Sequence, residues 1–347
     1  MRILNSGSVN NDHVCRADHS AGKGETIVVI GSLNMDFVVQ VEKLPMPGET
    51  LCGERFQMIP GGKGANQACA VGRLNGNGKM VGRVGEDVFG EQLLKSLQSA
   101  GVDTSKVLKT SNAATGVALI FVQKGGQNQI VIAPGANGQL TPQDVQAATG
   151  SIEGGYLLMQ LESPDETVET AASIGRARGM TTILDPAPVR PLSSGLVKNI
   201  DIITPNETEA LRLIGRSAGD VSLDEAPQIA QRLRELGPKT VILKMGEKGA
   251  WLVNDQFNRH FPAFKVEAVD ATAAGDTFNG ALAVALADGK PMDEAINFAN
   301  CAAAISVTRL GAQASIPTRQ EVDAMLRSGK VTASCGKISS AMPPISN

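Results

Sequence analysis

The most informative segment of the chain reads Asp270-Ala271-Thr272-Ala273-Ala274-Gly275-Asp276-Thr277-Phe278, and an alanine-rich helical pattern follows it at residues 280–286. Small residues at a helix start leave backbone amides without intrahelical acceptors, and partial positive charge collects there. We therefore expect the amides of Ala273, Ala274 and Gly275 to bind an anion. An ordinary N-cap is the alternative, and it would explain one aspartate.

Asp276 gives this turn a chemical role that capping does not explain. A carboxylate beside an anion-binding turn should repel a bound phosphate. It is useful there if it takes a proton from a hydroxyl group while the amides hold the phosphate that this hydroxyl attacks. The segment therefore indicates a phosphoryl-transfer site.

The composition of the 347 residues fits one large α/β domain, alone or with a small appendage. Because 32 Lys and Arg face 35 Asp and Glu without a basic run, we expect no nucleic-acid partner. No apolar stretch approaches the roughly 18 residues of a membrane span. The N-terminus lacks a secretion-signal pattern. The expected location is cytoplasmic.

The cysteines and histidines form no metal-binding or nucleophile pattern. The five cysteines lack CxxC spacing and are typical of buried small residues or free thiols in a reducing compartment: Cys15, Cys52, Cys69, Cys301 and Cys335. The three histidines lack obvious partners for a zinc site or a Ser-His-Asp triad. The chemistry that remains uses neither histidine nor thiolate.

Strand and helix patterns alternate along most of the chain. Apolar, β-branched runs predict buried strands at residues 26–30, 156–161, 182–184, 200–203 and 240–243. Helices are expected at 86–100, 165–178, 207–214, 224–236, 277–286, 292–308 and 319–326. This alternation predicts an α/β fold with a mostly parallel central sheet covered by helices on both faces.

Two separated stretches, residues 37–59 and 115–133, break this alternation and follow the pattern of antiparallel strands, the second around a turn at 124–128. We expect a small β-sheet from about 36–60 and 114–134, projecting over the strand ends as a lid. A surface ornament or an oligomer contact is the alternative. The other boundaries are a disordered extension at 1–24, a main domain at 25–328 and a loose tail at 329–347.

A second polar cluster begins at Gly61-Gly62-Lys63-Gly64-Ala65-Asn66-Gln67-Ala68. It is not a Walker loop, because the lysine comes too early and no Ser or Thr follows it. The glycines permit close approach of a ligand to the backbone, and Asn66 is expected to begin a helix. With Asn34 and Asp36, these donors and acceptors suit a polyhydroxylated small molecule. A simple glycine turn at a helix start explains the segment equally well.

Two further segments follow later strands. In Asn206-Glu207-Thr208-Glu209, a helix start would bring the first and last residues together. Glu209 is a candidate to hold Mg²⁺ through water, although an acidic helix start has the same sequence pattern. Gly246, in the segment Lys244-Met245-Gly246-Glu247-Lys248-Gly249, would admit a ligand, but a plain β-turn is the simpler interpretation.

Taken in order, these segments resemble those of the ribokinase/PfkB carbohydrate-kinase family, over residues 26–326. The most specific marks are GGKGANQA at 61–68 and DATAAGDTFNGA at 270–281, supported by NETE at 206–209 and VTRLGAQ at 307–313. The resemblance implies a three-layer αβα sandwich of the ribokinase-like type, with a β-lid that also forms the homodimer contact. It implies ATP-dependent phosphorylation of D-ribose at O5.

The resemblance also implies a role for individual residues. Asp276 would be the base, with Ala273, Ala274 and Gly275 as the anion hole. The sugar would contact Asn34, Asp36, Gly62, Lys63, Asn66, Glu162 and Asp276. ATP would lie against Asn206, Glu209, Lys244, Gly246, Gly275 and Asn300, with Mg²⁺ reached from Glu209 through water. A K⁺ site beside the anion hole would be formed by Asp270, Thr272, Ser306, Arg309, Gly311 and Ser315.

Three positions depart from the family's pattern. Ala271 replaces a usual Thr, small polar residue or Pro and bears on K⁺ dependence. Lys244 replaces a frequent Thr and bears on nucleotide preference. Asn75 replaces a usual Gly or Ser. None of these changes removes a reacting group.

Two rival functions remain open. The chain can be a kinase for another sugar (deoxyribose, fructose) or for a nucleoside, or a sugar sensor without activity. A nucleoside would need apolar stacking surface, and only 3% of the residues are aromatic. The intact Asp276 argues against a sensor.

Overall fold

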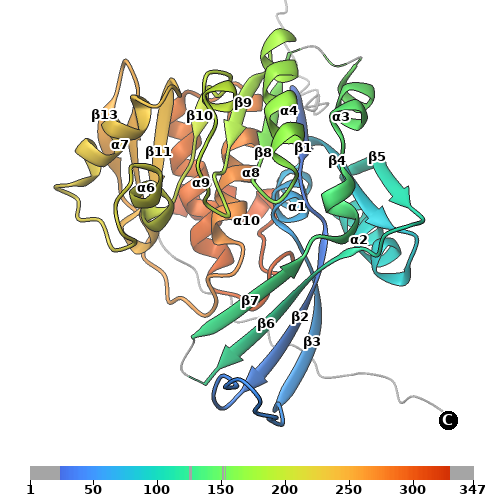
Figure 1. Ribbon diagram of the computed structural model, residues 1–347. Helices are drawn as coiled ribbons and strands as arrows, with labels where there is room; N and C mark the ends of the chain where they lie inside the picture. Colours follow the sequence, from blue (N-terminus) through green and yellow to red (C-terminus); the bar gives the residue numbers. More distant parts are fainter. Residues whose placement is uncertain (1–23, 125–126, 151, 153, 329–347) are drawn as a thin grey trace, which may run out of the picture.

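The computed structural model describes residues 24–124, 127–150, 152 and 154–328 (Figure 1). The predicted extension at 1–24, except for Gly24, and the predicted tail at 329–347 lie outside the described residues. Two positions of the turn expected at 124–128 also lie outside them. In the described part, no helix is both long and apolar enough to cross a membrane.

A nine-stranded sheet forms the centre of the main domain, in the order β13-β12-β11-β10-β9-β8-β1-β4-β5. All neighbours from β11 to β5 pair in parallel, whereas β12 and β13 add antiparallel strands at one edge. The strand bounds are β1 Thr26–Ile30, β4 Asn77–Gly85, β5 Asp103–Thr110, β8 Tyr156–Met159, β9 Thr181–Leu184, β10 Ile202–Ile203, β11 Thr240–Lys244, β12 Ala250–Val253 and β13 Asn258–Phe261.

The first strand shows why both faces of the sheet are covered. Successive side chains of a strand point to opposite faces. Ile27 and Val29 belong to one hydrophobic cluster, whereas Val28 and Ile30 belong to another, and all four are buried. A strand that is apolar on both faces is typical of a parallel sheet between two helical layers.

Helices cover the sheet on both sides and complete the αβα sandwich (Figure 1). One cluster joins the sheet to α1 Lys63–Arg73, α2 Val88–Ser99, α8 Ala274–Ala287, α9 Met292–Ser306 and α10 Arg319–Ser328. The other joins it to α3 Pro142–Thr149, α4 Asp165–Ala177, α5 Ser194–Val197, α6 Glu207–Leu213 and α7 Ala226–Arg234. The predicted fold class is confirmed.

Close packing of α1 against α8 brings their polar N-terminal residues together. A Cβ at Gly280 of α8 would stand 2.5 Å from the Cβ of Ala70 on α1, so a larger residue would push the helices apart. Helix α1 begins at Lys63, with Gly62 as N-cap, and not at Asn66 as expected. Asn66 therefore lies in the first turn of α1.

The separate four-stranded sheet has the order β3-β2-β6-β7 and projects from the main domain (Figure 1). Its strands are β2 Asn34–Val41, β3 Arg55–Gly61, β6 Gly116–Gln123 and β7 Asn128–Ala133. The expectation of an antiparallel sheet is wrong at its centre, because β2 and β6 pair in parallel while the outer pairs are antiparallel. Two antiparallel hairpins thus join through strands that run in the same direction.

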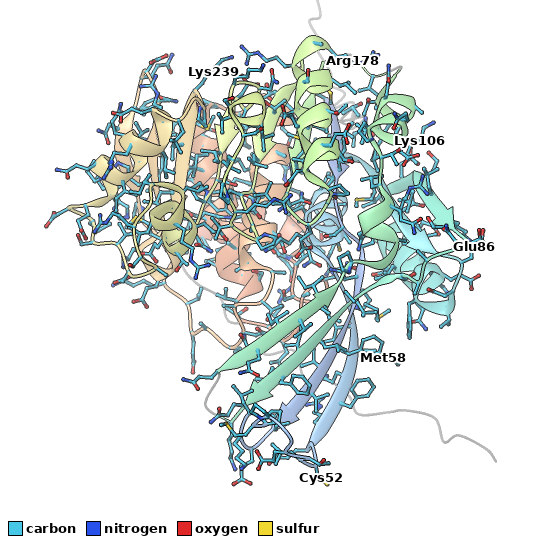
Figure 2. All side chains as sticks on the ribbon, in the orientation of Figure 1. Cys52, Met58, Glu86, Lys106, Arg178 and Lys239 are labelled. Carbon is cyan, nitrogen blue, oxygen red and sulfur yellow. The ribbon has the colours of Figure 1, made fainter. Side chains whose placement is uncertain are left out.

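The described residues of this lid leave large apolar side chains in solvent. Phe56, Met58 and Val131 are 56%, 52% and 61% exposed, and Met58 is labelled on the lid in Figure 2. Phe37 is instead covered, since it stacks on Phe56 and meets Phe89 of α2 edge-on. The lid is thus anchored at its base and apolar on its surface.

Candidate active site

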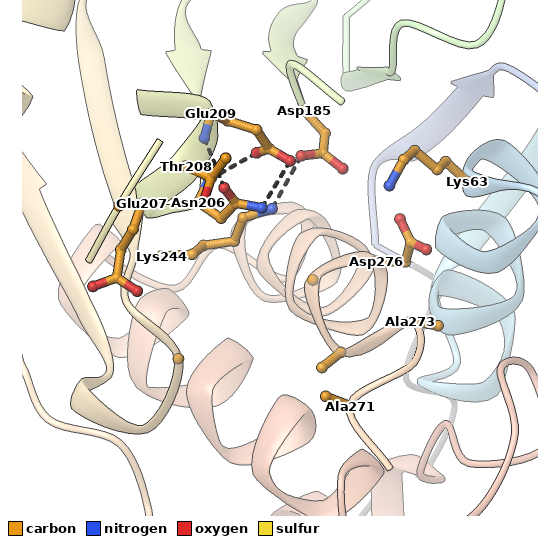
Figure 3. A pocket seen from close by; sticks show the side chains of 14 residues that line it. Lys63, Asp185, Asn206, Glu207, Thr208, Glu209, Lys244, Ala271, Ala273 and Asp276 are labelled. Atoms are coloured by element: carbon orange, nitrogen blue, oxygen red, sulfur yellow. Dashed lines mark hydrogen bonds and ion pairs between the residues drawn. The ribbon is translucent and has the colours of Figure 1, made fainter. Parts of the chain in front are cut away.

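A cavity of about 500 Å³ opens where the strands β9, β10 and β11 end and the helices α6 and α8 begin (Figure 3). Parallel sheets of this type bind ligands at the carboxyl ends of their strands. The cavity is lined by Lys63, Asp185, Asn206, Glu207, Thr208, Glu209, Gly219, Lys244, Gly246, Ala271, Ala273, Ala274, Gly275 and Asp276.

The turn before α8 is held by an unusual backbone conformation at Ala273. This residue is the N-cap of α8 and has φ of 59° and ψ of 14°, in the left-handed region. The prediction of three free amides is wrong at Ala274, whose N–H donates to the carbonyl of Ala271 at 3.2 Å. Within the described residues, the amides of Ala273 and Gly275 have no acceptor. These two donors, at the positive end of a helix, can bind an anion.

Asp276 lies in the first turn of α8 and is 6% exposed. Its Oδ2 accepts a hydrogen bond from Asn66 Nδ2 at 3.0 Å, and its Oδ1 accepts one from Gln67 Nε2 at 3.1 Å. Burial raises the pKa of Asp276 to about 6. The nearby Asp185 carboxylate also raises this pKa, whereas the Lys63 ammonium lowers it. At neutral pH the carboxylate is therefore ionised and ready to accept a proton.

Lys63 and Glu162 lie beside the Asp276 carboxylate. The backbone N–H of Lys63 donates to Glu162 Oε2 at 3.1 Å, and the hydroxyl of Ser32 donates to the same oxygen. Burial acts to lower the pKa of the Lys63 ammonium, but the negative charges of Asp276 and Asp185 outweigh it and raise this pKa. Lys63 remains a cation, and Figure 3 shows its side chain and that of Asp276 facing the same space.

The base of the lid contributes Asn34 and Asp36, both on β2. Asn34 is buried, and its Oδ1 accepts a hydrogen bond from Asn137 Nδ2 at 2.7 Å. Burial, helped by the charges of Glu162 and Asp276, raises the pKa of Asp36 to about 7.

Gly62 lets the backbone pass close to this group of residues. It has φ of 86°, and a Cβ there would stand 2.7 Å from the backbone nitrogen of Asn34. Asn34, Asp36, Gly62, Asn66 and Glu162 do not line the large cavity, but Lys63 and Asp276 connect them to it.

On the other side of the cavity, Asn206 and Glu209 form a reciprocal cap at the start of α6. Asn206 Oδ1 accepts from the Glu209 backbone N–H, while the backbone N–H and Nδ2 of Asn206 donate to the two Glu209 carboxylate oxygens, all at 2.8 Å. The predicted proximity of these two residues is confirmed. Each carboxylate oxygen keeps a second lone pair for a ligand.

Lys244 ends β11 and reaches the turn before α8. Its Nζ forms an ion pair with Asp185 Oδ1 at 3.0 Å (Figure 3). The same nitrogen would stand 3.3 Å from a Cβ at Gly275, so a cation lies beside the free amides. Gly246 has φ of 54° in a 3₁₀ turn and lines the cavity. Asn300 does not line the cavity. It is buried on α9, and its side-chain amide donates to the carbonyl of Phe261.

Sequence reasoning missed Asp185 and Gln67. Asp185 directly follows β9, is 3% exposed and accepts from Gln67 Nε2 at 3.0 Å. A polar residue directly after a predicted buried strand was the available signal. Gln67 stood within the quoted GGKGANQA segment, but nothing in the sequence says that its side chain points inward.

The residues expected at the K⁺ site lie on the loop before α8 and on the segment that runs from the end of α9 to Ser315, and Asp270 joins the two. Its Oδ1 accepts from the backbone N–H of Thr272 at 2.9 Å, and its Oδ2 accepts from the Gly311 N–H at 2.9 Å. Ser306 and Ser315 donate their hydroxyl protons to carbonyls of their own turns. The Arg309 side chain pairs with Glu321 instead, so only its backbone can serve this site.

A buried carboxylate at a helix start, next to two free amides on a polar cavity, fits one class of protein: an αβα phosphotransferase for a small hydroxylated acceptor. Residues 25–319 match the family described as "pfkB family carbohydrate kinase". The chain therefore belongs to the pfkB family of carbohydrate kinases.

Within this family, the chain is similar to several sugar kinases of known name. A ribokinase of Haemophilus influenzae is 44% identical over 298 residues, which cover 86% of this chain and 97% of the relative. A deoxyribokinase of Salmonella typhi is 38% identical over 303 residues, or 86% and 98% of the two chains. The structure of Arabidopsis thaliana ribokinase, complexed with ribose and ATP, is similar with a TM-score of 0.80 and 34% identity, covering 88% of this chain and 99% of that one.

Proposed function

We propose that this protein is a ribokinase, which transfers the γ-phosphoryl group of ATP to O5 of D-ribose and releases D-ribose 5-phosphate and ADP. The observation that carries the proposal is the position of Asp276. Its buried carboxylate lies in the first turn of α8, next to the free amides of Ala273 and Gly275. The family membership and the similarity to ribokinases support the same reaction.

The proposed mechanism divides the work between the base and the turn. The O5 hydroxyl loses its proton to Asp276 as the O5–phosphorus bond forms, and the bond between the γ-phosphorus and the β–γ bridging oxygen breaks to release ADP. The amides of Ala273 and Gly275, with the dipole of α8 behind them, stabilise the charge on the transferring group. Little covalent help is needed, because positioning and charge account for most of the rate in this chemistry.

The polar residues near Asp276 suit a sugar. Asn66 donates its Nδ2 to Asp276, but its buried Oδ1 has no partner in the described residues. A buried acceptor without a donor is costly, and a sugar hydroxyl would supply the missing donor. Asp36, Glu162 and the Lys63 ammonium add acceptors and a donor within the same group.

Mg²⁺ and K⁺ are proposed as the metal ions of this enzyme. Glu209 would hold Mg²⁺ through water, using the lone pairs that the cap leaves free. When bound, Mg²⁺ would neutralise charge on the phosphates of ATP. Asp270 and the carbonyls and hydroxyls of the 306–315 loop are hard oxygen ligands, which suit K⁺.

We also propose a homodimer through the lid. Phe56, Met58 and Val131 expose apolar surface, and clustered apolar side chains of this size mark contact surfaces. Light scattering should give twice the chain mass, and Val131→Lys should shift the protein toward monomer. A wild-type monomer at micromolar concentration would contradict the dimer.

The decisive test is ADP release with ATP and a panel of acceptors. D-ribose should give the highest kcat/KM, above deoxyribose, hexoses and nucleosides. A preference for deoxyribose would favour the second candidate function, which the similarity to a deoxyribokinase keeps open. Sugar binding without ADP release would indicate a sensor.

A further inference from the structure

Gln67 connects the base to the nucleotide side of the site. This residue of α1 is 1% exposed. Its Nε2 donates to Asp276 Oδ1 at 3.1 Å and to Asp185 Oδ2 at 3.0 Å, while its Oε1 accepts from Gln160 Nε2 at 2.7 Å. One amide group thus serves two buried carboxylates that would otherwise repel each other.

Chemistry fixes the orientation of this amide. If it were turned over, the Gln67 carbonyl would face two carboxylates and its NH₂ group would face that of Gln160, so all three contacts would be lost. Gln160 keeps its donor toward Gln67 even though its own buried Oε1 has no partner in the described part of the chain. An unpaired buried carbonyl costs stability. The Gln160 side chain is therefore oriented to hold Gln67, although this leaves its own carbonyl oxygen unpaired within the described residues.

We propose that Gln67, held by Gln160, is a positioning residue for phosphoryl transfer, which fixes the Asp276 carboxylate and keeps it ionised beside Asp185. The inference deepens the proposed kinase function and rests on it. Asp185 also pairs with Lys244, whose ammonium lies beside the free amides. The Gln67 amide therefore joins the Asp276 carboxylate to the Asp185–Lys244 ion pair by hydrogen bonds.

The groups around Asp276 determine the direction in which its pKa should move when one of them is lost. Burial and the Asp185 carboxylate raise the pKa of Asp276. The Lys63 ammonium and the hydrogen bonds from Asn66 and Gln67 lower it. Loss of the Gln67 donor should therefore raise the pKa of the base. Loss of the Asp185 charge should lower it.

A further carboxylate, Asp36 on the lid, lies near enough to the base for their charges to interact. Loss of the Gln67 donor or of the Asp185 charge leaves Asp36 unchanged. A general loosening of the fold would not shift the pKa of the base in opposite directions in the two variants.

The test is the pH dependence of kcat with ribose and ATP, from about pH 5 to about pH 9, in Gln67→Met, Gln160→Met and Asp185→Asn. The acid limb should move up by about one unit in Gln67→Met, by less in Gln160→Met, and down in Asp185→Asn. Thermal melting identifies any variant that does not fold. If Gln67→Met is unfolded, the opposite shifts of the other two variants still decide the matter.

A fall in kcat of equal size at every pH, with an unmoved acid limb, would overturn the inference, because it would show a structural role only. Wild-type protein without ribose-dependent ADP release would overturn the proposed function instead. The two failures are therefore distinguishable.

Discussion

The proposed acceptor end of the site and its proposed nucleotide end are built in different ways. The Asp276 carboxylate and its partners Asn66 and Gln67 are buried, and Asn66 keeps an acceptor that has no partner among the described residues. Across the cavity, Asn206 is exposed and its polar atoms are already paired with those of Glu209. A ligand that satisfies buried, unpaired groups is strongly discriminated from one that does not. We therefore expect strict choice of the acceptor and tolerant choice of the nucleotide.

The largest expected effect is that of Asp276→Asn on turnover. The amide keeps the size of the side chain but cannot accept the hydroxyl proton, and loss of a base typically costs about 10²–10⁴-fold in rate. Steady-state kinetics measure turnover, and calorimetry checks that ribose and ATP still bind. More than about a tenth of wild-type turnover would rule out this base.

Two lysines allow the two ends to be compared directly. Lys63→Ala should raise the KM for ribose by about 10–100-fold, because it removes a partly buried charged donor, and should leave the KM for ATP nearly unchanged. Lys244→Ala should do the reverse and by less, because Lys244 already has Asp185 as partner. Because loss of the Lys63 charge raises the pKa of Asp276, both variants are assayed at alkaline pH, where ionisation of Asp276 is favoured. Equal changes in both constants would erase the distinction between the ends.

The dependence of kcat on K⁺ tests the turn before α8, which lies between the two ends of the site. We expect a few-fold rise in kcat when K⁺ replaces Na⁺ at constant ionic strength, because a cation at Asp270 would fix the amides of Ala273 and Gly275 as donors. The effect should weaken in Asp270→Ala, which removes the acceptor of the Gly311 N–H. Equal rates in K⁺, Na⁺ and a bulky organic cation would leave the proposed site without a role.

The smallest effect concerns stability and the buried charge of Asp36. Its pKa is raised from 3.8 to about 7, so the unfolded chain ionises first and the folded protein loses stability as pH rises from about 4 to about 7. The difference of about three units corresponds to at most about 4 kcal/mol. Asp36→Asn should therefore melt a few degrees higher than wild type at about pH 8, and by less at about pH 5. An equal gain at both pH values would contradict this origin.

Much of the fold could be predicted because its central strands are apolar on both faces. β1, β8, β9 and β11 were found from short runs of mostly apolar residues. β4 and β5 were missed for physical reasons. β4 contains three glycines, and β5, with the sequence DTSKVLKT at the sheet edge, is mostly polar. Edge strands carry such residues because one side of the ladder is open to solvent.

The site was less predictable than the fold. Motif residues such as Lys63 and Asp276 are recognisable because their neighbours in sequence are glycines and a helix start. Asp185 and Gln160 act through contacts with residues far away along the chain, and Gln160 lies 93 residues from its partner Gln67. Which amide faces which carboxylate follows from the packing of α1 against the sheet and α8, and no local pattern records it.

The left-handed Ala273 has a consequence for the rigidity of the turn before α8. A left-handed alanine costs about 1–2 kcal/mol, which glycine would avoid, but glycine would add about 0.4–1 kcal/mol of entropy to the unfolded chain. The first term is the larger, so the difference of roughly 0–1.6 kcal/mol favours glycine, and alanine at this position costs some folding stability. Alanine makes the turn that presents the free amides stiffer, because its backbone has fewer alternative conformations than that of glycine.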